Sequence, residues 1–356
     1  MTRRVQLRSL AKINLDLRVL YKRPDGFHEL RTVFQTISLA DKIAIEYEPA
    51  RRTSLDLDVA EENATLNTPD NLILKAARAV LDATRTTARI RFSLQKNIPM
   101  GGGLGGGSSN AAAILVSLPV LIGKSLSLND LTEMGSLLGS DVPFFLTGGT
   151  AVGVDRGTET YPLADVAQEP MLVVSSGLHV ATGVAYQALR RPTWPDSAAP
   201  EGSAQGRHGS SGLTSRDLSR KINSFQSFVQ ALVDTRSAKE ASVFSANDFE
   251  QVVFGQHPQL KTLLGKLRSR AGVRKGEGCA RMTGSGSALF ALFGAVTERD
   301  RARRVLEADK VFQGCRVMPA SMVSRKSFQR MWRKQLAEHL DPASEGTWPP
   351  QSRHAR

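Results

Sequence analysis

The chain has 356 residues, of which 41% are hydrophobic, and a formal net charge of +13. That length allows two domains with substantial cores. No apolar run approaches the roughly 18 residues of a membrane-spanning helix, and the charged N-terminal residues lack the apolar centre of a signal peptide. We therefore expect a cytoplasmic protein without membrane contact.

Cysteines and aromatic residues narrow the range of functions. The two cysteines, Cys279 and Cys315, form neither a metal-ligand spacing nor a disulfide framework, so we expect no protein-ligated metal and a reducing compartment. The positive charge suits either a nucleic acid or a polyanionic small substrate. Aromatic residues make up only 6% and are not interleaved with basic residues in a strand pattern, which disfavours nucleic acid.

The first predicted strand, residues 12–19, alternates strictly between apolar and polar side chains. Its apolar face carries Ile13, Leu15, Leu17 and Val19, and its polar face carries Lys12, Asn14, Asp16 and Arg18. Taken alone, this alternation is typical of a half-buried strand with one face in solvent.

A glycine-rich loop follows a second alternating strand at residues 88–95. Six of the seven residues 101–107 are glycine, and an apolar run begins just after Ser108 and Ser109. This run predicts a helix with a serine at or near its N-cap. Because unpaired N–H groups and the helix dipole both favour an anion, the pattern predicts a phosphate-binding loop. Its residues are Pro99, Met100, Gly101, Gly102, Gly103, Leu104, Gly105, Gly106, Gly107, Ser108 and Ser109.

Other interpretations of the glycine loop fit less well. A dinucleotide-binding turn leaves its strand directly and meets an acidic residue about 20 positions later, at the end of a second strand. Here residues 96–100 intervene, and another helix opens at that distance. A Walker A loop needs a lysine that this loop lacks. A flexible linker would have polar flanks instead of a strand and an apolar helix.

Asp141 stands between Gly139, which ends a predicted helix, and the sequence Val142–Pro143. Its carboxylate could cap the element that begins there, which is a common role for aspartate. The alternative is that it acts as a general base.

The second half of the chain begins with a continuous apolar strand at residues 170–175. Residues 195–222 are rich in Gly, Ser and Pro, and we expect a flexible insertion there. A second glycine turn occupies residues 283–288. The tail at 326–356 is basic, then contains Pro and Ser, and we expect it to be disordered.

Three blocks occur in one order: AKINLDL near the N-terminus, PMGGGLGGGSSNAA, and RMTGSGSALF near the C-terminus. Together they resemble the signature motifs of the galactokinase, homoserine kinase, mevalonate kinase and phosphomevalonate kinase superfamily. The stretches PDGFHEL and GSDVPFF narrow the resemblance to the branch that acts on a cytidine-diphosphate substrate. It covers roughly residues 5 to 325.

The resemblance implies a mixed α/β (α+β) fold with two domains. Residues 1–167 would be similar to ribosomal protein S5 domain 2, and residues 168–325 would be ferredoxin-like. The implied activity is ATP-dependent phosphorylation of the 2-hydroxyl of 4-diphosphocytidyl-2-C-methyl-D-erythritol, in the non-mevalonate isoprenoid pathway. Another small-alcohol kinase of the superfamily and an S5-like nucleic-acid-binding protein are the alternatives.

The resemblance also assigns catalytic and ATP-binding roles. Lys12 would lie beside Asp141, where it would keep the carboxylate of the general base ionised. The glycine loop would hold the ATP phosphates, and Ser108 or Ser109 would lie near a Mg²⁺ held mainly by phosphates and water. Two further ATP contacts stay open. Lys96 could reach a phosphate or be an exposed lysine at a strand end, and Asn71 could face adenine or simply begin a helix.

The substrate contacts that the resemblance implies surround a cytosine base. Asn14 would contact the substrate, and His28 would read the cytosine edge. Phe27 and Tyr186 would stack on the two faces of the base, with Thr182 nearby. Relatives usually carry tyrosine where this chain has Phe27, so one polar contact is lost while stacking is retained.

Overall fold

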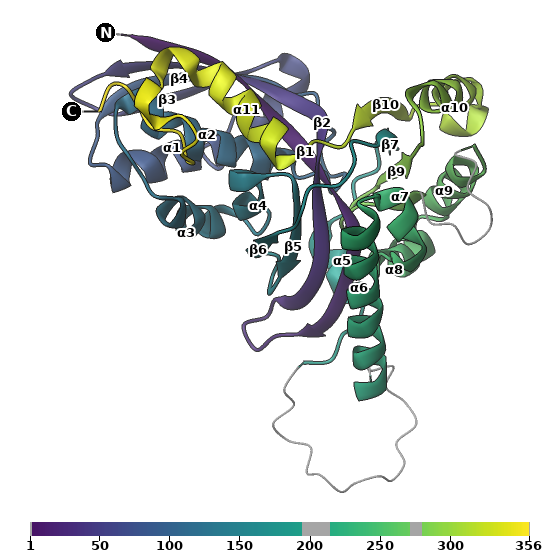
Figure 1. Cartoon of the computed structure of the whole chain (residues 1–356). Coiled ribbons are helices and arrows are strands. Elements are labelled where there is room, and N and C mark those ends of the chain that lie inside the picture. Colours follow the sequence, from purple (N-terminus) through teal and green to yellow (C-terminus); the bar gives the residue numbers. More distant parts are fainter. Residues whose placement is uncertain (1, 194–213, 271–279, 356) are drawn as a thin grey trace, which may run out of the picture.

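A six-stranded sheet forms the N-terminal part of the computed structural model, which describes residues 2–193, 214–270 and 280–355 (Figure 1). Five strands follow the order β3–β4–β2–β5–β6, and β1 pairs with β2. The strands are β1 (Arg3–Lys22), β2 (His28–Pro49), β3 (Ser54–Val59), β4 (Ala88–Gln95), β5 (Thr150–Val154) and β6 (Glu159–Pro162). The helices of this part are α1 (Leu72–Ala83), α2 (Gly106–Ile122), α3 (Leu128–Leu138) and α4 (Val142–Thr147).

The second sheet has four antiparallel strands in the order β10–β7–β9–β8. Its strands are β7 (Pro170–Ser175), β8 (Ala280–Met282), β9 (Ala288–Leu292) and β10 (Arg316–Ser321). The helices of this part are α5 (Thr182–Ala188), α6 (Ser215–Thr235), α7 (Ala238–Ala241), α8 (Phe249–Gln256), α9 (Pro258–Arg270) and α10 (Val296–Ala308). Two sheets with their own helices agree with the predicted two-domain α/β architecture.

Strand β4 confirms the alternation expected from its sequence. Its apolar side chains are buried and its polar ones are exposed along the whole strand. Strand β1 does not follow this rule, because Lys12, Asn14, Asp16 and Arg18 are all buried. Residues of the second part cover this face: the Arg18 guanidinium donates to Ser224 Oγ at 3.2 Å and to the Phe244 carbonyl at 2.8 Å. A solvent-facing polar side of β1 is therefore wrong.

The expected flexible insertion at 195–222 is partly wrong. Residues 195–213 lie outside the described residues. Thr214 and Asp217 form a capping box at the start of α6, so residues 215–222 are helical. The Thr-x-x-Asp spacing carries this signal in the sequence.

The disorder expected for the tail at 326–356 is also wrong. Helix α11 (Arg325–Leu336) lies over the N-terminal part of the molecule (Figure 1). Phe328, Trp332 and Leu336 recur every four residues, so they share one helix face, and all three are buried in the N-terminal core. Further along the tail, the Trp348 indole N–H donates to the Leu146 carbonyl at 2.9 Å. The tail completes the first core instead of fraying from it.

None of the helices in the described part of the chain combines the length and the apolar character that crossing a bilayer requires.

Candidate active site

A cleft of about 880 Å³ brings together residues from both parts of the chain. The predicted site residues in its wall are Lys12, Asn14, Phe27, His28, Gly103, Gly105, Ser108, Asp141, Thr182 and Tyr186. They come from β1, the β1–β2 turn, the start of β2, the glycine loop, the start of α4 and helix α5. Residues as far apart in sequence as Lys12 and Tyr186 therefore face one space.

The glycine loop ends in helix α2, as the sequence predicts, but the cap differs. Gly105 is the N-cap residue, with a left-handed φ of 69°, and Ser108 lies inside the first turn. Among the described residues, no hydrogen-bond acceptor is present for the backbone N–H groups of Gly106, Gly107 and Ser108. Free N–H groups at the positive end of a 17-residue helix are an arrangement suited to an anion.

The second glycine turn packs directly against the glycine loop. The Ala288 N–H donates to the Gly102 carbonyl at 3.3 Å. A Cβ on Gly103 would come within 2.5 Å of the Thr283 carbonyl oxygen, and one on Gly286 would come within 2.4 Å of the Gly102 carbonyl carbon. The two backbones touch only because both positions lack side chains.

This contact predicts that Gly286→Ala displaces the glycine loop. The added methyl group would meet backbone atoms, which cannot rotate away, so we expect a loss of about 1–3 kcal/mol in the free energy of unfolding and a higher KM for ATP. Gly265 in α9 has nothing within 4 Å of its Cβ position. Gly265→Ala should therefore leave KM unchanged. Urea unfolding and steady-state kinetics measure both effects, and equal behaviour of the two variants would contradict the contact.

Lys12 and Asp141 form an ion pair at the centre of the cleft. Lys12 Nζ lies 3.1 Å from Asp141 Oδ2, and the side chains are 4% and 30% exposed, respectively. Lys12 Nζ also donates to Asn14 Oδ1 at 2.8 Å, and Asn14 Nδ2 donates to Thr32 Oγ1 at 2.7 Å. These contacts hold the Lys12 ammonium group in an orientation that points toward the Asp141 carboxylate.

Asp141 is the N-cap residue of α4, yet its side chain accepts no capping hydrogen bond. The interpretation of Asp141 as a helix cap therefore fails. Its carboxylate instead combines partial exposure to the cleft with a buried cation, which is an arrangement suited to a general base.

Asp41 is a site residue that the sequence analysis missed. Its side chain is fully buried. One oxygen accepts the backbone N–H groups of Asn97 and Ile98, each at 2.8 Å, and the other accepts Asn110 Nδ2 at 3.1 Å. Because Asn97 and Ile98 lead into the glycine loop and Asn110 belongs to α2, Asp41 joins both ends of the loop.

Lys96 completes the Asp41 cluster and does not line the cleft. Its Nζ donates to Asp41 Oδ2 at 2.8 Å and to the Ile98 carbonyl at 2.7 Å. Burial lowers the pKa of Lys96, and the nearby Asp41 charge opposes that shift. The structure contradicts the exposed interpretation, because the Lys96 side chain is buried. Its Nζ binds Asp41 and the Ile98 carbonyl and so stabilises the loop, and its contact with a phosphate stays a prediction.

Asn71 and Ser109 also use their side chains within the fold. Asn71 caps α1 by accepting the Ile73 N–H at 2.9 Å, and its amide donates to the Leu66 carbonyl at 2.8 Å. Ser109 Oγ donates to the Leu10 carbonyl at 2.6 Å. The helix-start interpretation of Asn71 is confirmed, and of the two serines only Ser108 lines the cleft.

The remaining residues of the glycine loop contribute to its conformation. Leu104 is buried in a core cluster, whereas Met100 is half exposed. A Cβ on Gly101, which has a φ of 69°, would lie 2.5 Å from His179 Nδ1. Pro99, Gly101 and Gly102, like Gly106 and Gly107, do not line the cleft, and their contact with ATP stays a prediction.

The far end of the cleft carries the predicted aromatic residues. Phe27 is half exposed, with the Arg156 guanidinium 4.6 Å from its ring centre. The rings of His28 and Tyr186 are 4.8 Å apart, and Tyr186 also packs edge-on against Phe249. The ring neighbours of Tyr186 are therefore His28 and Phe249, while Phe27 lines the same cleft without direct ring contact to Tyr186 among the contacts of the described residues.

Two pKa shifts define the protonation states at this end. Burial, followed by the charges of Lys22 and Arg191, lowers the pKa of His28, so its imidazole is neutral near pH 7 and can both donate and accept. Burial, followed by the Asp141 charge, raises the pKa of Tyr186, which stays a neutral phenol. Tyr186 is thus within electrostatic reach of Asp141 and in ring contact with His28.

Thr182 begins α5, and Ser285 Oγ donates to its hydroxyl at 3.1 Å. This contact ties the second glycine turn to the helix that carries Tyr186. Within the described residues, no group of three His, Cys, Asp or Glu side chains could hold a metal ion. Ser108 and Asp141 are the oxygen donors near the helix α2 N-terminus, which suits a cation that arrives with phosphates.

Two family models match the chain. The GHMP kinases N terminal domain matches residues 71–149, which include the glycine loop and Asp141. The GHMP kinases C terminal domain matches residues 229–308, which include the second glycine turn.

Similar proteins have more specific names. A 4-diphosphocytidyl-2-C-methyl-D-erythritol kinase of Solibacter usitatus is 47% identical over 99% of this chain and 98% of its own length. The protein of the same name from Gloeobacter violaceus is 33% identical over 84% of this chain and 87% of its own. A crystal structure of 4-(cytidine 5'-diphospho)-2C-methyl-D-erythritol kinase is 30% identical, has a TM-score of 0.66, and aligns over 89% of this chain and 98% of its own. A homoserine kinase from Cytophaga hutchinsonii, at 16% identity and a TM-score of 0.64 over 90% of this chain and 95% of its own, shares the fold.

Proposed function

The chain belongs to the 4-diphosphocytidyl-2-C-methyl-D-erythritol kinases, a branch of the GHMP kinases, and on that premise we propose how its cleft carries out the reaction. The activity is ATP-dependent phosphorylation of 4-diphosphocytidyl-2-C-methyl-D-erythritol, a step of isoprenoid biosynthesis.

The ATP phosphates bind at the N-terminus of α2. The unpartnered N–H groups of Gly106, Gly107 and Ser108 point out of the helix end, where the dipole favours negative charge. Mg²⁺, when bound, neutralises phosphate charge. Ser108 offers it one hydroxyl oxygen, and phosphate oxygens and water supply the rest. Asp41 and Lys96 keep the loop in place.

Asp141 acts as the general base. The substrate hydroxyl gives its proton to the carboxylate as its oxygen bonds to the γ-phosphorus and ADP leaves. Lys12 Nζ, which lies 3.1 Å from the carboxylate, holds it in position and remains beside the developing negative charge. Asn14 holds Lys12 in that position.

The cytidine part binds at the opposite end of the cleft. Neutral His28 pairs with the cytosine edge, because a neutral imidazole both donates and accepts. Tyr186 and Phe27 offer aromatic surface for the base, and Thr182 lies at the start of the same helix as Tyr186. Tyr186 lies in ring contact with His28 and within electrostatic reach of Asp141.

The Lys12–Asp141 pair beside an unpartnered helix N-terminus is the observation that carries this proposal. It is tested by incubating the protein with ATP, Mg²⁺ and one alcohol at a time, and measuring ADP. Diphosphocytidyl methylerythritol should yield ADP, whereas mevalonate and homoserine should not. ADP from mevalonate or homoserine alone would refute the assigned substrate.

Stacking on Phe27 gives a further prediction. Base stacking on an aromatic side chain contributes about 1–3 kcal/mol, so Phe27→Ala should raise the substrate KM by roughly one to two powers of ten. Phe27→Tyr should change it little, because it keeps the ring. The KM for ATP should stay constant in both variants. An unchanged substrate KM in Phe27→Ala would remove Phe27 from the cytosine site.

A further inference from the structure

The His28 end of the cleft carries more positive charge than its carboxylates balance. Lys22, Arg190 and Arg191 all line it. Neither Lys22 nor Arg190 has a carboxylate partner within the described ranges 2–193, 214–270 and 280–355. The positive charges of Lys22 and Arg191 also lower the pKa of His28. This end therefore favours an anion, unlike the Asp141 end, where Lys12 already balances the carboxylate.

Arg191 is held with one edge of its guanidinium free. Its side chain is only 14% exposed, and its Nη2 lies 2.9 Å from Asp248 Oδ2. Its Nε is buried and has no hydrogen-bond partner among the described residues. A buried unpaired donor costs free energy, and an acceptor that reached Nε would recover that energy.

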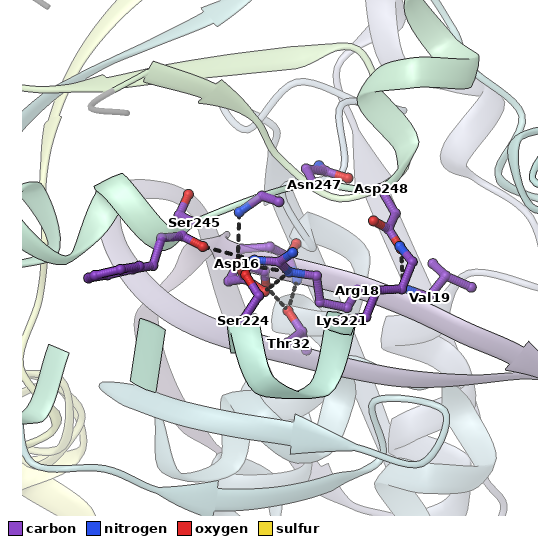
Figure 2. A network of polar contacts seen from close by, with 12 residues as sticks. Asp16, Arg18, Val19, Thr32, Lys221, Ser224, Ser245, Asn247 and Asp248 are labelled. Atoms are coloured by element: carbon purple, nitrogen blue, oxygen red, sulfur yellow. Dashed lines mark hydrogen bonds and ion pairs between the residues drawn. The ribbon is translucent and has the colours of Figure 1, made fainter. Parts of the chain in front are cut away.

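Asp248 fixes Arg191 to the framework of the cleft. The same carboxylate accepts the Val19 N–H of β1 at 2.9 Å and pairs with Lys221 of α6, as Figure 2 shows. One carboxylate thus faces two cations. It orients Arg191 but leaves net positive charge beside the cleft.

We propose that Arg191 binds the diphosphate bridge of the cytidyl substrate, and that Asp248 positions it. This rests on the proposed function, which places cytosine at His28 and the reacting hydroxyl at Asp141. The diphosphate joins those two parts of the substrate, so it lies between the two ends of the cleft. Arginine suits this ligand because its planar donors match phosphate oxygens. The cleft would then hold two anion sites, one for ATP at α2 and one for the substrate at Arg191.

The test compares cytidine 5'-diphosphate with cytidine by calorimetry, with a non-hydrolysable ATP analogue saturating the ATP site. Hydrogen bonds to charged groups predict that Arg191→Gln weakens cytidine diphosphate binding about ten- to a hundredfold. Cytidine affinity should not change, since it lacks the diphosphate. Arg191→Lys keeps the charge without the planar fork and should fall between the wild type and Arg191→Gln.

Arg220→Gln is the matched control, because Arg220 lies on the exposed surface of α6 and pairs only with Asp217. It should bind both ligands as the wild type does. Unchanged cytidine diphosphate affinity in both Arg191 variants, or an equal loss for cytidine, would overturn the diphosphate site. Failure of the proposed function would look different: the wild type itself would release no ADP with the cytidyl substrate.

Discussion

Asp141→Asn is expected to lower kcat by about 10²–10⁴-fold, the usual range for the loss of a general base. The amide keeps the size of the carboxylate but cannot accept the hydroxyl proton, and Lys12 loses its charged partner at 3.1 Å. The KM values for ATP and substrate should change little, because neither the glycine loop nor the cytosine end is altered. Steady-state kinetics measure these values.

A control variant separates loss of the base from a general effect of removing a carboxylate. Asp130 lies in the exposed capping box of α3, outside the cleft. Asp130→Asn should leave kcat unchanged. A near-normal kcat in Asp141→Asn would mean that positioning alone drives the transfer, and Asp141 would lose its assigned role.

Asp41→Ala is expected to reduce the free energy of unfolding by about 3–5 kcal/mol, as when one partner of a buried ion pair is removed. Lys96 would remain buried without its carboxylate, and the Asn97 and Ile98 N–H groups would lose their acceptor. Because these groups lead into the glycine loop, the KM for ATP should also rise. Urea unfolding measures the stability, and initial rates measure the KM.

Two further variants test whether the loss of stability is specific to the buried Asp41–Lys96 ion pair. Asp70–Lys75 is an exposed ion pair, so Asp70→Ala should leave stability unchanged within error. Adding Lys96→Met to Asp41→Ala should restore part of the stability, because it removes the unpaired buried charge. Equal stability of the Asp41 and Asp70 variants would contradict the anchoring role.

Local sequence patterns predicted the parts of the site whose backbone conformation is determined by residues close together in the sequence. The glycine run feeding an apolar stretch predicted the loop and helix α2, and the strict alternation at 88–95 predicted β4. From residue spacing alone, Lys12 would lie on the solvent-facing side of a strand and Asp141 would cap a helix. Only the resemblance to a kinase superfamily placed the two side chains together.

Long-range contacts explain most of what the sequence did not predict. Asp41 binds residues 55 to 69 positions away, and Asp248 binds residues 57 and 229 positions away, so no local pattern marks either as a site residue. Helix α11 is different, because its Phe328, Trp332 and Leu336 carry a helical spacing that predicts an apolar face. The basic residues between them obscured that signal.

Phosphorus NMR of the product tests the central claim most directly. The protein is incubated with diphosphocytidyl methylerythritol, ATP and Mg²⁺, and the new phosphomonoester resonance is recorded with proton coupling. The carbon that bears the 2-hydroxyl also carries the methyl group and has no hydrogen. Transfer to that hydroxyl therefore predicts a resonance without vicinal proton coupling, absent with Asp141→Asn over the same time. A resonance split by neighbouring protons would place the phosphoryl group on another hydroxyl, and the same yield from Asp141→Asn would contradict the mechanism.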